Sequence, residues 1–372
     1  MTLTNRQKKY KILFSGGGTG GSVAPLLAIF EELKNDPSFE FVWIGTKDGL
    51  GKEMIGNKNI KYYAICAGKL RRYWSYQNVI DIFNIFLAFW QSLFIILKEN
   101  SCIIISAGSF VSVPLAWAGW FCRIPILIHQ QDVLPGLANK LMALIAKKIT
   151  TTFEKSLHDY GKKAEWIGNP IRRELIENKV GKAEAYQKLG LKSDWPTLLV
   201  LGGGTGAMAI NKLIENNLKE LLKFCQIIHI TGKGKLIINT DNSNYHSFEF
   251  LDTFGLIKVF AAADIVISRC GMNVLTELSY LGKPTILIPI PNSHQEANAK
   301  IFADNNAAIV LDQNKLSDRY LVDNVKELIN NKRKQTELGD NIQKVIKKEA
   351  NQELVKIVKE ILQEVKIFSN QI

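Results

Sequence analysis

The sequence predicts an α/β protein of two tandem domains, each built on a parallel β-sheet, that face a central cleft. The 372 residues are enough for about two domains at roughly 150 residues per domain. Short apolar runs alternate with helical segments, which is typical of parallel βαβ units. The pattern restarts near mid-chain, where residues 198–207 read LLVLGGGTGA and repeat the ILFSGGGTGG of residues 12–21. Because open α/β sheets bind ligands beyond the carboxyl ends of their strands, we expect the ligand in the cleft.

The domain boundaries follow from where the strand–helix pattern stops and restarts. The first domain is predicted to span residues 1–172 and the second residues 196–349, joined by a charged linker at residues 173–195. A Lys/Glu-rich amphipathic helix is predicted from Gln343 to Phe368, and residues 350–372 are expected to pack back on the first domain. The predicted strands are Lys11–Phe14, Phe41–Ile44, Ile103–Ser106, Ile126–His129, Lys148–Thr152, Thr197–Leu201, Gln226–Thr231, Ile265–Ser268 and Thr285–Pro289.

Composition and charge limit the classes of function. Lys plus Arg number 47 against 35 for Asp plus Glu, and the net charge of +12 favours acidic partners such as phosphates or an anionic membrane. No zinc-finger spacing or aromatic RNA-binding signature is present, so no nucleic-acid partner is expected. None of the five cysteines forms a CxxC pair, which indicates a reducing cytoplasm. The apolar run Ile12–Phe14 is shorter than the roughly 7–15 residues of a secretory signal, so export is not expected.

The segment Val79–Leu97 is apolar enough to raise the question of a membrane. It reads VIDIFNIFLAFWQSLFIIL, and about 20 apolar residues can cross a bilayer. Polar residues interrupt it at helical intervals, which predicts an amphipathic helix with a wide apolar face. Three arrangements stay open: packing under a neighbouring protein face, which the residues alone favour, monotopic membrane contact, and a true span. The interrupting and flanking polar residues are Gln77, Asp81, Asn84, Gln91, Ser92 and Lys98.

Each glycine-rich loop follows a predicted strand and precedes a predicted helix. Glycine lets the backbone turn sharply and approach a ligand closely, and a helix N-terminus offers N–H groups to an anion. No lysine follows the glycines as in a P-loop, so ATP hydrolysis is not indicated. The strand Phe41–Ile44 ends in Gly45-Thr46 and not in an acidic residue, which disfavours NAD. The alternative is that the glycines only form tight strand–helix turns.

Polar segments follow other predicted strands in the second half of the chain. Ser268–Glu277 has a glycine turn at the start of a helix, which suits a diphosphate, and Glu277 could accept hydrogen bonds from ribose hydroxyls. Pro289–Ala299 offers the side-chain amides of Gln295 and Asn298, which both donate and accept and therefore suit a sugar. Taken singly, each residue is more often a surface or cap residue, but their position after successive strands favours a functional role.

In the first half, His129 and Asp132 lie at the end of a predicted strand. A histidine that faces a cleft can move protons near neutral pH, but a buried structural histidine fits the sequence as well. Asp132 fits either a general base or a helix N-cap. No Asp-x-Asp pair occurs in the chain, which argues against a metal-dependent sugar transferase, and the GxSxG elbow of a serine hydrolase is also absent.

Over essentially its whole length the chain resembles the MurG family of peptidoglycan N-acetylglucosaminyltransferases. The motifs that carry the resemblance are, in order, GGGTGG, GSFVSVP, IHQQDVLPGLANK, GNPIRREL, GGGTGA, TGKG, SRCGMNVLTEL and HQEANA. The resemblance implies the GT-B fold of two Rossmann-like domains, the first for the acceptor and membrane and the second for the UDP-sugar. It implies inverting transfer of N-acetylglucosamine from UDP-N-acetylglucosamine to the undecaprenyl-diphosphate-linked muramyl pentapeptide (lipid I), without metal or cofactor. It also implies a peripheral enzyme at the cytoplasmic face of the cell membrane.

The resemblance implies roles for particular residues as well. Thr19, Gly20 and Gly21 would approach the acceptor diphosphate and the donor sugar, and Arg172 would reach the donor. The donor-binding residues would be Gly204 at the phosphates, Leu251 at the uracil, Met272, Asn273, Val274, Leu275, Thr276 and Glu277 around the diphosphate and ribose, and Gln295 at the sugar.

The resemblance also changes the interpretation of the apolar segment. Phe83, Phe86 and Trp90, together with Trp120, match the family's membrane-docking face. Monotopic contact with an anionic membrane surface therefore becomes the preferred arrangement.

The chain departs from the family pattern at positions that bear on catalysis. Ser22 stands where the family has a histidine after GGTGG, and serine alone is no base near neutral pH. The family's HEQN reads His129-Gln130-Gln131-Asp132, which exchanges a carboxylate and an amide. Val274 and Gly204 stand in place of a threonine and a serine. Asp132 is therefore the first candidate for the general base and His129 the second.

These departures leave alternatives open. One is a GT-B relative that uses a different acceptor or acts as a UDP-N-acetylglucosamine 2-epimerase. The other is a catalytically weak protein that binds a nucleotide sugar.

Overall fold

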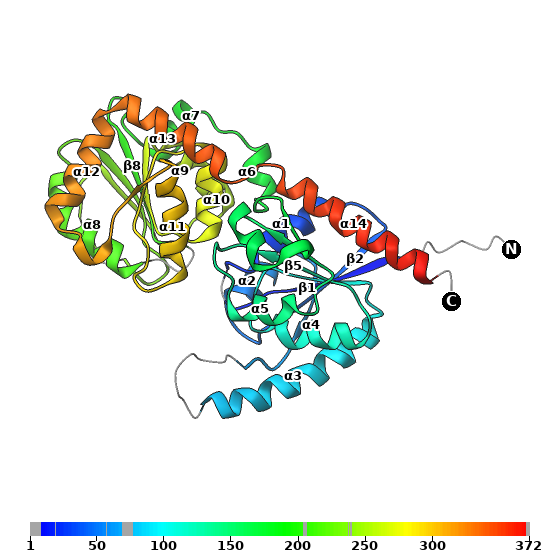
Figure 1. The fold of residues 1–372 in the computed structure, drawn as a ribbon. Coiled ribbons are helices and arrows are strands. Elements are labelled where there is room, and N and C mark those ends of the chain that lie inside the picture. The colour runs from blue at the N-terminus through cyan, green and yellow to red at the C-terminus, as the bar shows by residue number, and fades with distance from the viewer. Residues whose placement is uncertain are drawn as a thin grey trace. The chain divides into compact units, whose positions relative to one another are not determined.

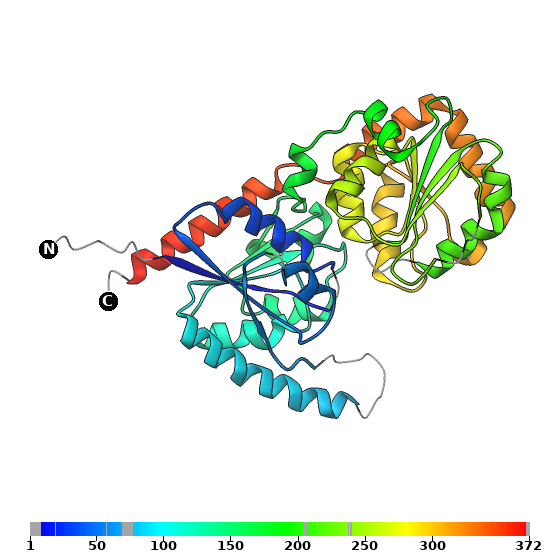
Figure 2. The same cartoon turned by 180° about the vertical axis from the view of Figure 1, so that it is seen from behind.

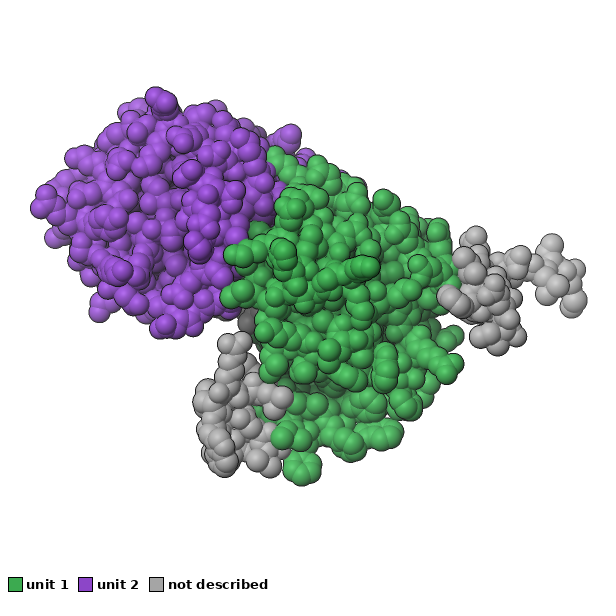
Figure 3. Space-filling model, in the orientation of Figure 1, with its two compact units in different colours: residues 1–172, 347–372 green, residues 173–346 purple. Residues whose placement is uncertain are grey.

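The computed structural model describes residues 9–18, 20–56, 58–68, 77–203, 207–236, 238 and 240–369. The chain divides into two compact units (Figure 3). Unit 1 comprises residues 1–172 and 347–372, so the chain returns to it at its C-terminal end. Unit 2 comprises residues 173–346.

Unit 1 is built on a seven-stranded parallel sheet of the order β3-β2-β1-β4-β5-β6-β7. β1 pairs with both β2 and β4, so the strand order reverses there. In open α/β sheets ligands bind at the carboxyl ends of the strands beside such a reversal. The strands are β1 (Tyr10–Ser15), β2 (Phe39–Gly45), β3 (Lys61–Ala64), β4 (Ile103–Ser106), β5 (Ile126–Gln130), β6 (Lys148–Thr151) and β7 (Ala164–Trp166).

Helices cover both faces of this sheet (Figures 1 and 2). Successive residues of a strand point to opposite faces, so Ile12 and Phe14 join one hydrophobic cluster and Leu13 the other. The first cluster contains residues of α1 (Ala24–Leu33), α2 (Leu50–Gly56) and α14 (Ala350–Ser369). The second contains residues of α3 (Gln77–Glu99), α4 (Ser112–Phe121) and α5 (Leu137–Ala143).

Unit 2 repeats this plan on a six-stranded parallel sheet of the order β10-β9-β8-β11-β12-β13. β8 pairs with both β9 and β11, so the order reverses at the strand that leads into the second glycine loop. The strands are β8 (Thr197–Leu201), β9 (Gln226–Ile230), β10 (Tyr245–Phe248), β11 (Ile265–Ser268), β12 (Thr285–Leu287) and β13 (Ile309–Val310). The helices are α6 (Arg173–Glu177), α7 (Lys182–Leu189), α8 (Met208–Leu221), α9 (Thr253–Ala262), α10 (Met272–Leu281), α11 (His294–Asp304), α12 (Asp318–Asn330) and α13 (Lys332–Val345).

The two predicted parallel sheets are confirmed, and the differences lie at their edges. The edge strands β3, β7, β10 and β13 are not among the predicted strands, because they are only two to four residues long. The single helix predicted from Gln343 to Phe368 is wrong. α13 ends at Val345 and α14 begins at Ala350, because the chain passes from unit 2 to unit 1 in this break.

Residues 173–195, predicted as a linker, contain α6 and α7 and belong to unit 2. Asp264 ties α7 to the start of β8, since its carboxylate accepts from Lys182 Nζ at 2.6 Å and from the backbone N–H of Thr197 at 2.9 Å. Burial alone would raise the pKa of Asp264, but these two hydrogen bonds outweigh burial and lower that pKa. The segment is therefore part of the folded unit.

The C-terminal segment is fastened where it re-enters unit 1. Asn351 Nδ2 donates to Ile171 O at 3.0 Å, and Ile171 N donates to Asn351 Oδ1 at 2.9 Å. Gly168 has φ +91°, and a Cβ there would lie 2.3 Å from Lys347 O, so this position requires glycine. α14 then packs Leu354, Val358 and Leu362 into the first hydrophobic cluster. Figure 1 shows α14 beside α1.

Helix α3 buries part of its polar stripe together with Ala88, Ile95 and Ile96, and it also exposes many large apolar side chains, unlike an ordinary surface helix. Ser92 has no exposed surface, and Gln91 Oε1 accepts a 2.7 Å hydrogen bond from Cys66 N. Within the described residues, Ile80–Glu99 is the single stretch long and apolar enough to cross a membrane by length and composition. The α3–α4 apolar surface consists of side chains that are 48–71% exposed: Ile80, Ile82, Phe83, Phe86, Leu87, Trp90, Phe94, Leu97, Trp120 and Phe121.

Glu99, at the end of α3, binds this helix to two strands. Its buried carboxylate accepts hydrogen bonds from Lys61 Nζ at 2.7 Å, Tyr63 OH at 2.6 Å and Lys11 Nζ at 3.0 Å. Burial alone would raise the pKa of Glu99, but these three donors outweigh it and lower that pKa from its ordinary 4.5 to about 2. Since the folded-state pKa is the lower one, the stabilisation is present above pH 4.5 and is lost as the pH falls toward 2.

Glu99→Gln is therefore expected to lower the free energy of unfolding at pH 7 by about 2 kcal/mol, a figure reduced for screening at the exposed Lys61. Urea unfolding at pH 7 and pH 3.5 measures this, and the difference between wild type and variant should narrow at the lower pH. Glu154→Gln, at an exposed carboxylate of the same unit, is the control and should leave the free energy of unfolding unchanged at both pH values. If Glu99→Gln lowered the free energy of unfolding equally at both pH values, the stabilisation would not come from the charged carboxylate of Glu99.

Candidate active site

The first glycine loop, residues 16–21, is held to unit 1 through its carbonyl groups. Trp43 Nε1 donates to Gly16 O at 3.0 Å, and Ser109 Oγ donates to Gly17 O at 3.1 Å. These donors come from β2 and from the turn between β4 and α4. The loop is therefore fixed by its two neighbouring strands at the carboxyl edge of the sheet.

Three residues of this loop are predicted to approach the acceptor. Thr19 lies outside the described residues, whereas Gly20 and Gly21 lead directly into α1. The N-terminus of α1 has no side-chain cap, but Ala24 N donates to Gly20 O at 3.1 Å and Pro25 has no N–H, so this helix start offers few free donors to an anion. Ser22 is buried, and its Oγ donates to Gly17 O at 3.4 Å, so the serine supports the loop.

Gln130, the last residue of β5, shapes the loop that carries Asp132. Gln130 Nε2 donates to the carbonyl oxygens of Asp132 at 2.7 Å and Leu134 at 3.2 Å. Gln130 Oε1 accepts from Tyr160 OH at 2.8 Å and from Asn139 Nδ2. A glutamate here would direct a carboxylate oxygen at two carbonyl oxygens, so this loop requires the amide that the sequence provides.

The loops after β1, β4 and β5 form one hydrogen-bonded group. Gln131 Nε2 donates to Ala107 O at 3.0 Å, which joins the β5 loop to the β4 loop. Ser109 in turn joins the β4 loop to the first glycine loop. The half-buried Asp132 and the glycine loop therefore lie at the same edge of the sheet.

His129, the second candidate for the general base, has no exposed surface. Its Nδ1 lies 3.0 Å from Thr150 Oγ1 and its Nε2 lies 2.7 Å from Asn169 Oδ1. Burial lowers the pKa of His129 to about 4, against the raising effect of the Asn169 hydrogen bond. Because both ring nitrogens are occupied inside the protein, the structure favours the structural alternative and not a catalytic role.

In unit 2, the turn between β11 and α10 begins a helix that has no side-chain cap. Gly271 is the N-cap with φ −77°, and a Cβ there would have no neighbour within 4 Å in the described chain. The fold therefore does not require glycine here, and the open space at the helix start suits a bound anion. Side chains do cap four other helices of this unit, namely Asp252 on α9, Ser293 on α11, Ser317 on α12 and Asn331 on α13.

α11 holds this turn from the other side. Gln295 Oε1 accepts from the backbone N–H groups of Cys270 and Ile290, each at 3.2 Å. Asn298 Nδ2 donates to Cys270 O at 3.2 Å. Because the oxygen of Gln295 is occupied, its Nε2 is the end of the amide that can donate to a ligand.

The side chains of the predicted donor-binding residues on α10 divide into two groups. Leu275 has no exposed surface, and the Oγ1 of the buried Thr276 donates to Met272 O at 2.7 Å, so these two side chains serve the fold. Asn273 and Val274 are half-buried. Leu275, predicted to bind substrate, can therefore contribute only through its backbone.

Four more of the predicted site residues lie on other parts of the two units or farther along α10. Glu277 is 3% exposed on α10. Leu251 is half-buried and immediately precedes the N-cap of α9. Arg172 is half-buried and is the last residue of unit 1 before the chain enters unit 2. Gly204, in the second glycine loop, lies outside the described residues.

The TGKG loop after β9 is fixed by a series of hydrogen bonds between buried side chains. Asn211 Nδ2 donates to the carbonyl oxygens of Thr231 and Lys235, each at 3.0 Å. His229 Nε2 lies 3.1 Å from Asn211 Oδ1, and Tyr245 OH lies 3.0 Å from His229 Nδ1. Because both amide hydrogens of Asn211 go to carbonyls, His229 must donate to Asn211 and Tyr245 must donate to His229.

Two known domain families match this chain, one in each half. Residues 12–151 match the glycosyltransferase family 28 N-terminal domain and residues 197–354 match its C-terminal domain. The UDP-N-acetylglucosamine–N-acetylmuramyl-(pentapeptide) pyrophosphoryl-undecaprenol N-acetylglucosamine transferase of Clostridium kluyveri is 39% identical, over 86% of this chain and 91% of that protein. A Clostridium botulinum protein of the same name is 38% identical, over 91% and 99%. The chain belongs to the MurG family.

Solved structures of lower identity share the GT-B fold. MurG of Acinetobacter baumannii superimposes with a TM-score of 0.73 at 22% identity and covers 94% of this chain and 99% of its own. The UDP-N-acetylglucosamine 2-epimerase of Neisseria meningitidis, bound to UDP-N-acetylglucosamine, gives 0.70 at 13% identity, over 94% and 100%. At these identities the likeness concerns the fold alone, so membership of the MurG family rests on the sequence match.

One residue of this MurG-family site is not among the predicted site residues. Arg269 follows β11, and its Nη1 donates to Ile288 O at 3.0 Å and Pro289 O at 3.1 Å. Its Nη2 donates to Gln313 Oε1 at 2.7 Å. Burial lowers the pKa of Arg269 from its ordinary value. An arginine directly after an apolar strand is a sequence feature that could have drawn attention to this position. Its hydrogen-bond partners could not be predicted in this way, because they come from distant segments of the chain.

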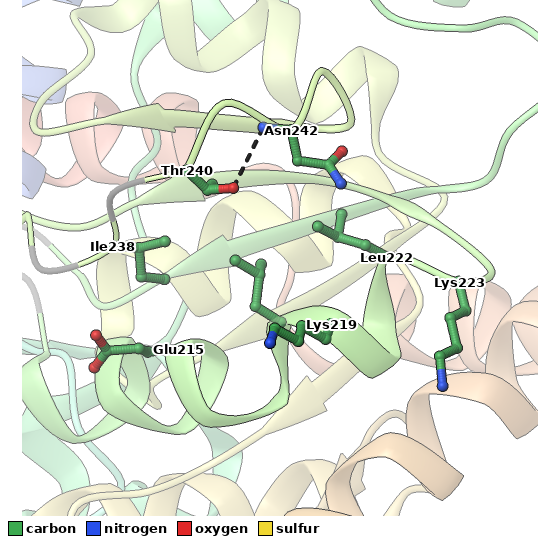
Figure 4. Close-up of a pocket in the computed structure, with 8 residues that line it drawn as sticks. Glu215, Lys219, Leu222, Lys223, Ile238, Thr240 and Asn242 are labelled. Carbon is green, nitrogen blue, oxygen red and sulfur yellow. Dashed lines mark hydrogen bonds between the residues drawn. The ribbon is translucent and has the colours of Figure 1, made fainter.

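Across the part of the chain that is described, no group of three or more His, Cys, Asp or Glu side chains could hold a metal ion. An open cavity of about 470 Å³ lies between α8 and the segment before β10 (Figure 4). It borders the second half of α8, away from the strand ends that carry the predicted site, and is lined by Glu215, Leu218, Lys219, Leu222, Lys223, Ile238, Thr240 and Asn242.

Proposed function

We propose that this protein transfers N-acetylglucosamine from UDP-N-acetylglucosamine to the lipid-linked muramyl-pentapeptide diphosphate, which converts lipid I to lipid II in peptidoglycan synthesis. The observation that carries the proposal is 38–39% identity to transferases of that name over 86–91% of the chain. The epimerase of the same fold is 13% identical, so epimerisation has no comparable support.

The donor binds to unit 2 in this proposal. The start of α10 and the second glycine loop, with Gly204 at the phosphates, offer N–H groups to the diphosphate. Leu251 contacts the uracil and Glu277 accepts from the ribose. Gln295 donates from Nε2 to a hydroxyl of the sugar, because its Oε1 is held by Cys270 and Ile290.

The acceptor binds to unit 1. Thr19, Gly20 and Gly21 approach its diphosphate, and Arg172 serves the donor. Asp132 is the general base. Its carboxylate is half-buried on a loop that Gln130 holds in place, whereas His129 has no exposed surface.

The reaction requires a base and stabilisation of the leaving group. The acceptor hydroxyl oxygen forms a bond to the anomeric carbon while the bond from that carbon to the diphosphate oxygen breaks, and UDP leaves with the electron pair. Asp132 takes the hydroxyl proton, which contributes about 10²–10⁴-fold. The N–H groups and dipole at the start of α10 stabilise the negative charge that develops on the diphosphate.

An assay with the purified protein tests this function. With UDP-N-acetylglucosamine, a lipid I analogue and EDTA, we expect UDP release and a disaccharide product, each dependent on acceptor. A parallel incubation without acceptor should leave the donor unchanged. Epimerised donor in that arm, or UDP binding without turnover in the first, would each replace the proposal with one of the alternatives.

We also propose that the α3–α4 apolar surface lies in the headgroup region of the cytoplasmic face of the cell membrane. The inner side of α3 is fixed, because Ala88, Ile95 and Ile96 belong to the core and Gln91 is bonded to Cys66. A helix held in this way can bury its outer side in lipid but would have to leave the protein to span the bilayer. The net charge of +12 favours an anionic surface.

The combined substitution Phe83→Ser, Phe86→Ser and Trp90→Ser is expected to reduce binding to anionic vesicles by at least about tenfold. These side chains are 71%, 62% and 53% exposed, so the melting temperature should not fall. Vesicle co-sedimentation and thermal unfolding measure the two effects. Tyr320→Ser, at a 52% exposed tyrosine of unit 2, is the control. Undiminished vesicle binding by the triple variant would contradict this placement.

A further inference from the structure

Arg269 is a buried cation that has no acidic partner. The residue is 6% exposed, and its three hydrogen-bond acceptors are two backbone carbonyls and the amide of Gln313. Its Nε is buried without a hydrogen-bond partner among the described residues. No ion pair joins it to an Asp or Glu in that part of the chain. A buried charge is unfavourable unless an opposite charge compensates it.

Neighbouring groups of the protein do not supply this compensation. The thiolate of the adjacent Cys270 could compensate the charge of Arg269, but burial raises the pKa of this thiol to about 12, so it stays neutral at physiological pH. Asp312 lies next to Gln313 in sequence, but its carboxylate accepts from Asn314 N at 2.9 Å and its charged partner is Lys315, whose Nζ lies 3.8 Å away. Among the described residues no carboxylate is paired with this guanidinium, so its charge is available to an anion from outside the chain.

The guanidinium is rigidly connected to the start of α10. Its acceptors Ile288 and Pro289 directly precede Ile290, whose N–H donates to Gln295 Oε1. The same oxygen accepts from Cys270 N, one residue before the N-cap of α10. The cation and the uncapped helix start consequently move together.

We propose that Arg269 is the fixed counter-charge for the diphosphate of the bound nucleotide sugar. It is a positioning residue: it holds a positive charge behind the helix start and sets the turn that orients Gln295, without contacting the phosphates. The inference rests on the proposed function, since it requires a nucleotide diphosphate at the N-terminus of α10. Because the negative charge on the diphosphate increases as UDP leaves, Arg269 should favour the transition state more than the bound donor.

A ligand series that varies only in charge tests this role. Calorimetry compares UDP, UMP and uridine on the wild type, Arg269→Gln and Arg269→Lys. Arg269→Gln keeps a donor for the carbonyls but removes the charge, so UDP affinity should fall by about 10- to 100-fold, UMP affinity by less, and uridine affinity not at all. Arg269→Lys should retain most of the UDP affinity. A merely structural role would lower the affinity for all three ligands equally.

The controls separate this inference from the proposed function. Arg319→Gln removes an equal charge from an exposed position in unit 2 and should leave UDP affinity unchanged. If the wild type fails to bind UDP, the proposed donor site is wrong. If the wild type binds UDP and Arg269→Gln binds UDP equally well, the proposed role of Arg269 is wrong. The role is also wrong if Arg269→Gln loses as much affinity for uridine as for UDP. If Arg269→Gln does not fold, the ratio of UDP to uridine affinity in Arg269→Lys decides, and a ratio far below that of the wild type would overturn the inference.

Discussion

Asp132→Asn is expected to lower the rate of transfer by about 10²–10⁴-fold and to leave UDP affinity within about twofold. Asparagine has the same shape, and the backbone carbonyl of residue 132 keeps its hydrogen bond from Gln130. The loop should therefore keep its conformation and lose only the base. UDP affinity should persist because the donor elements belong to unit 2 and Asp132 to unit 1. Steady-state kinetics with a lipid I analogue and calorimetry with UDP measure these effects.

Asp159→Asn is the matched control, since Asp159 is an exposed carboxylate of the same unit. It should transfer at the wild-type rate. A rate for Asp132→Asn above about a tenth of the wild-type rate would mean that another group takes the proton. His129→Ala does not compete with this interpretation, because it removes two buried hydrogen bonds and should act through stability.

The central part of the fold was predictable because its sequence signals are local. A strand buried on both faces must be apolar along its length, and a strand–helix turn against a ligand site favours glycine. These rules located β1, β8 and their glycine loops directly. The edge strands escaped them because β3 and β7 are held by pairing with β2 and β6, which no local pattern reveals.

The orientation of α3 could not be derived from periodicity alone. The polar stripe was recognised, but a stripe indicates two faces and not which of them is inside. Here Gln91 lies inside, where Cys66 N provides a hydrogen-bond donor for its side chain, and the neighbouring Ser92 is buried with it. Only the three-dimensional partner decides the orientation.

The same limit applies to the candidate site. The sequence placed Gln295 and the start of α10 after neighbouring strands, which was enough to group them. It did not reveal that Arg269 joins segments 19 to 44 residues away, nor that Gln295 Oε1 is occupied by two backbone N–H groups. For His129 the sequence left two alternatives equal, and the distinction required the positions of Thr150 and Asn169.

Gln295→Glu is expected to lower kcat/KM for UDP-N-acetylglucosamine by about 10²–10³-fold while the protein stays as stable as the wild type. The glutamate Oε1 can still accept from Cys270 N and Ile290 N, so the turn before α10 is preserved. What changes is the outer atom, where an oxygen replaces the donating Nε2 and adds a negative charge close to the diphosphate. Steady-state kinetics and urea unfolding separate the two effects.

Two further variants make this result interpretable. Gln295→Leu removes the acceptor as well, and since it leaves two N–H groups without a partner it should also reduce the free energy of unfolding, by about 1–3 kcal/mol. Gln187→Glu makes the same amide-to-acid change at an exposed position of α7 and should affect neither measurement. A stable Gln295→Glu protein with nearly unchanged kcat/KM would show that Nε2 does not meet the donor. In that case the amide at position 295 only holds the turn, and recognition of the sugar must be sought on another loop.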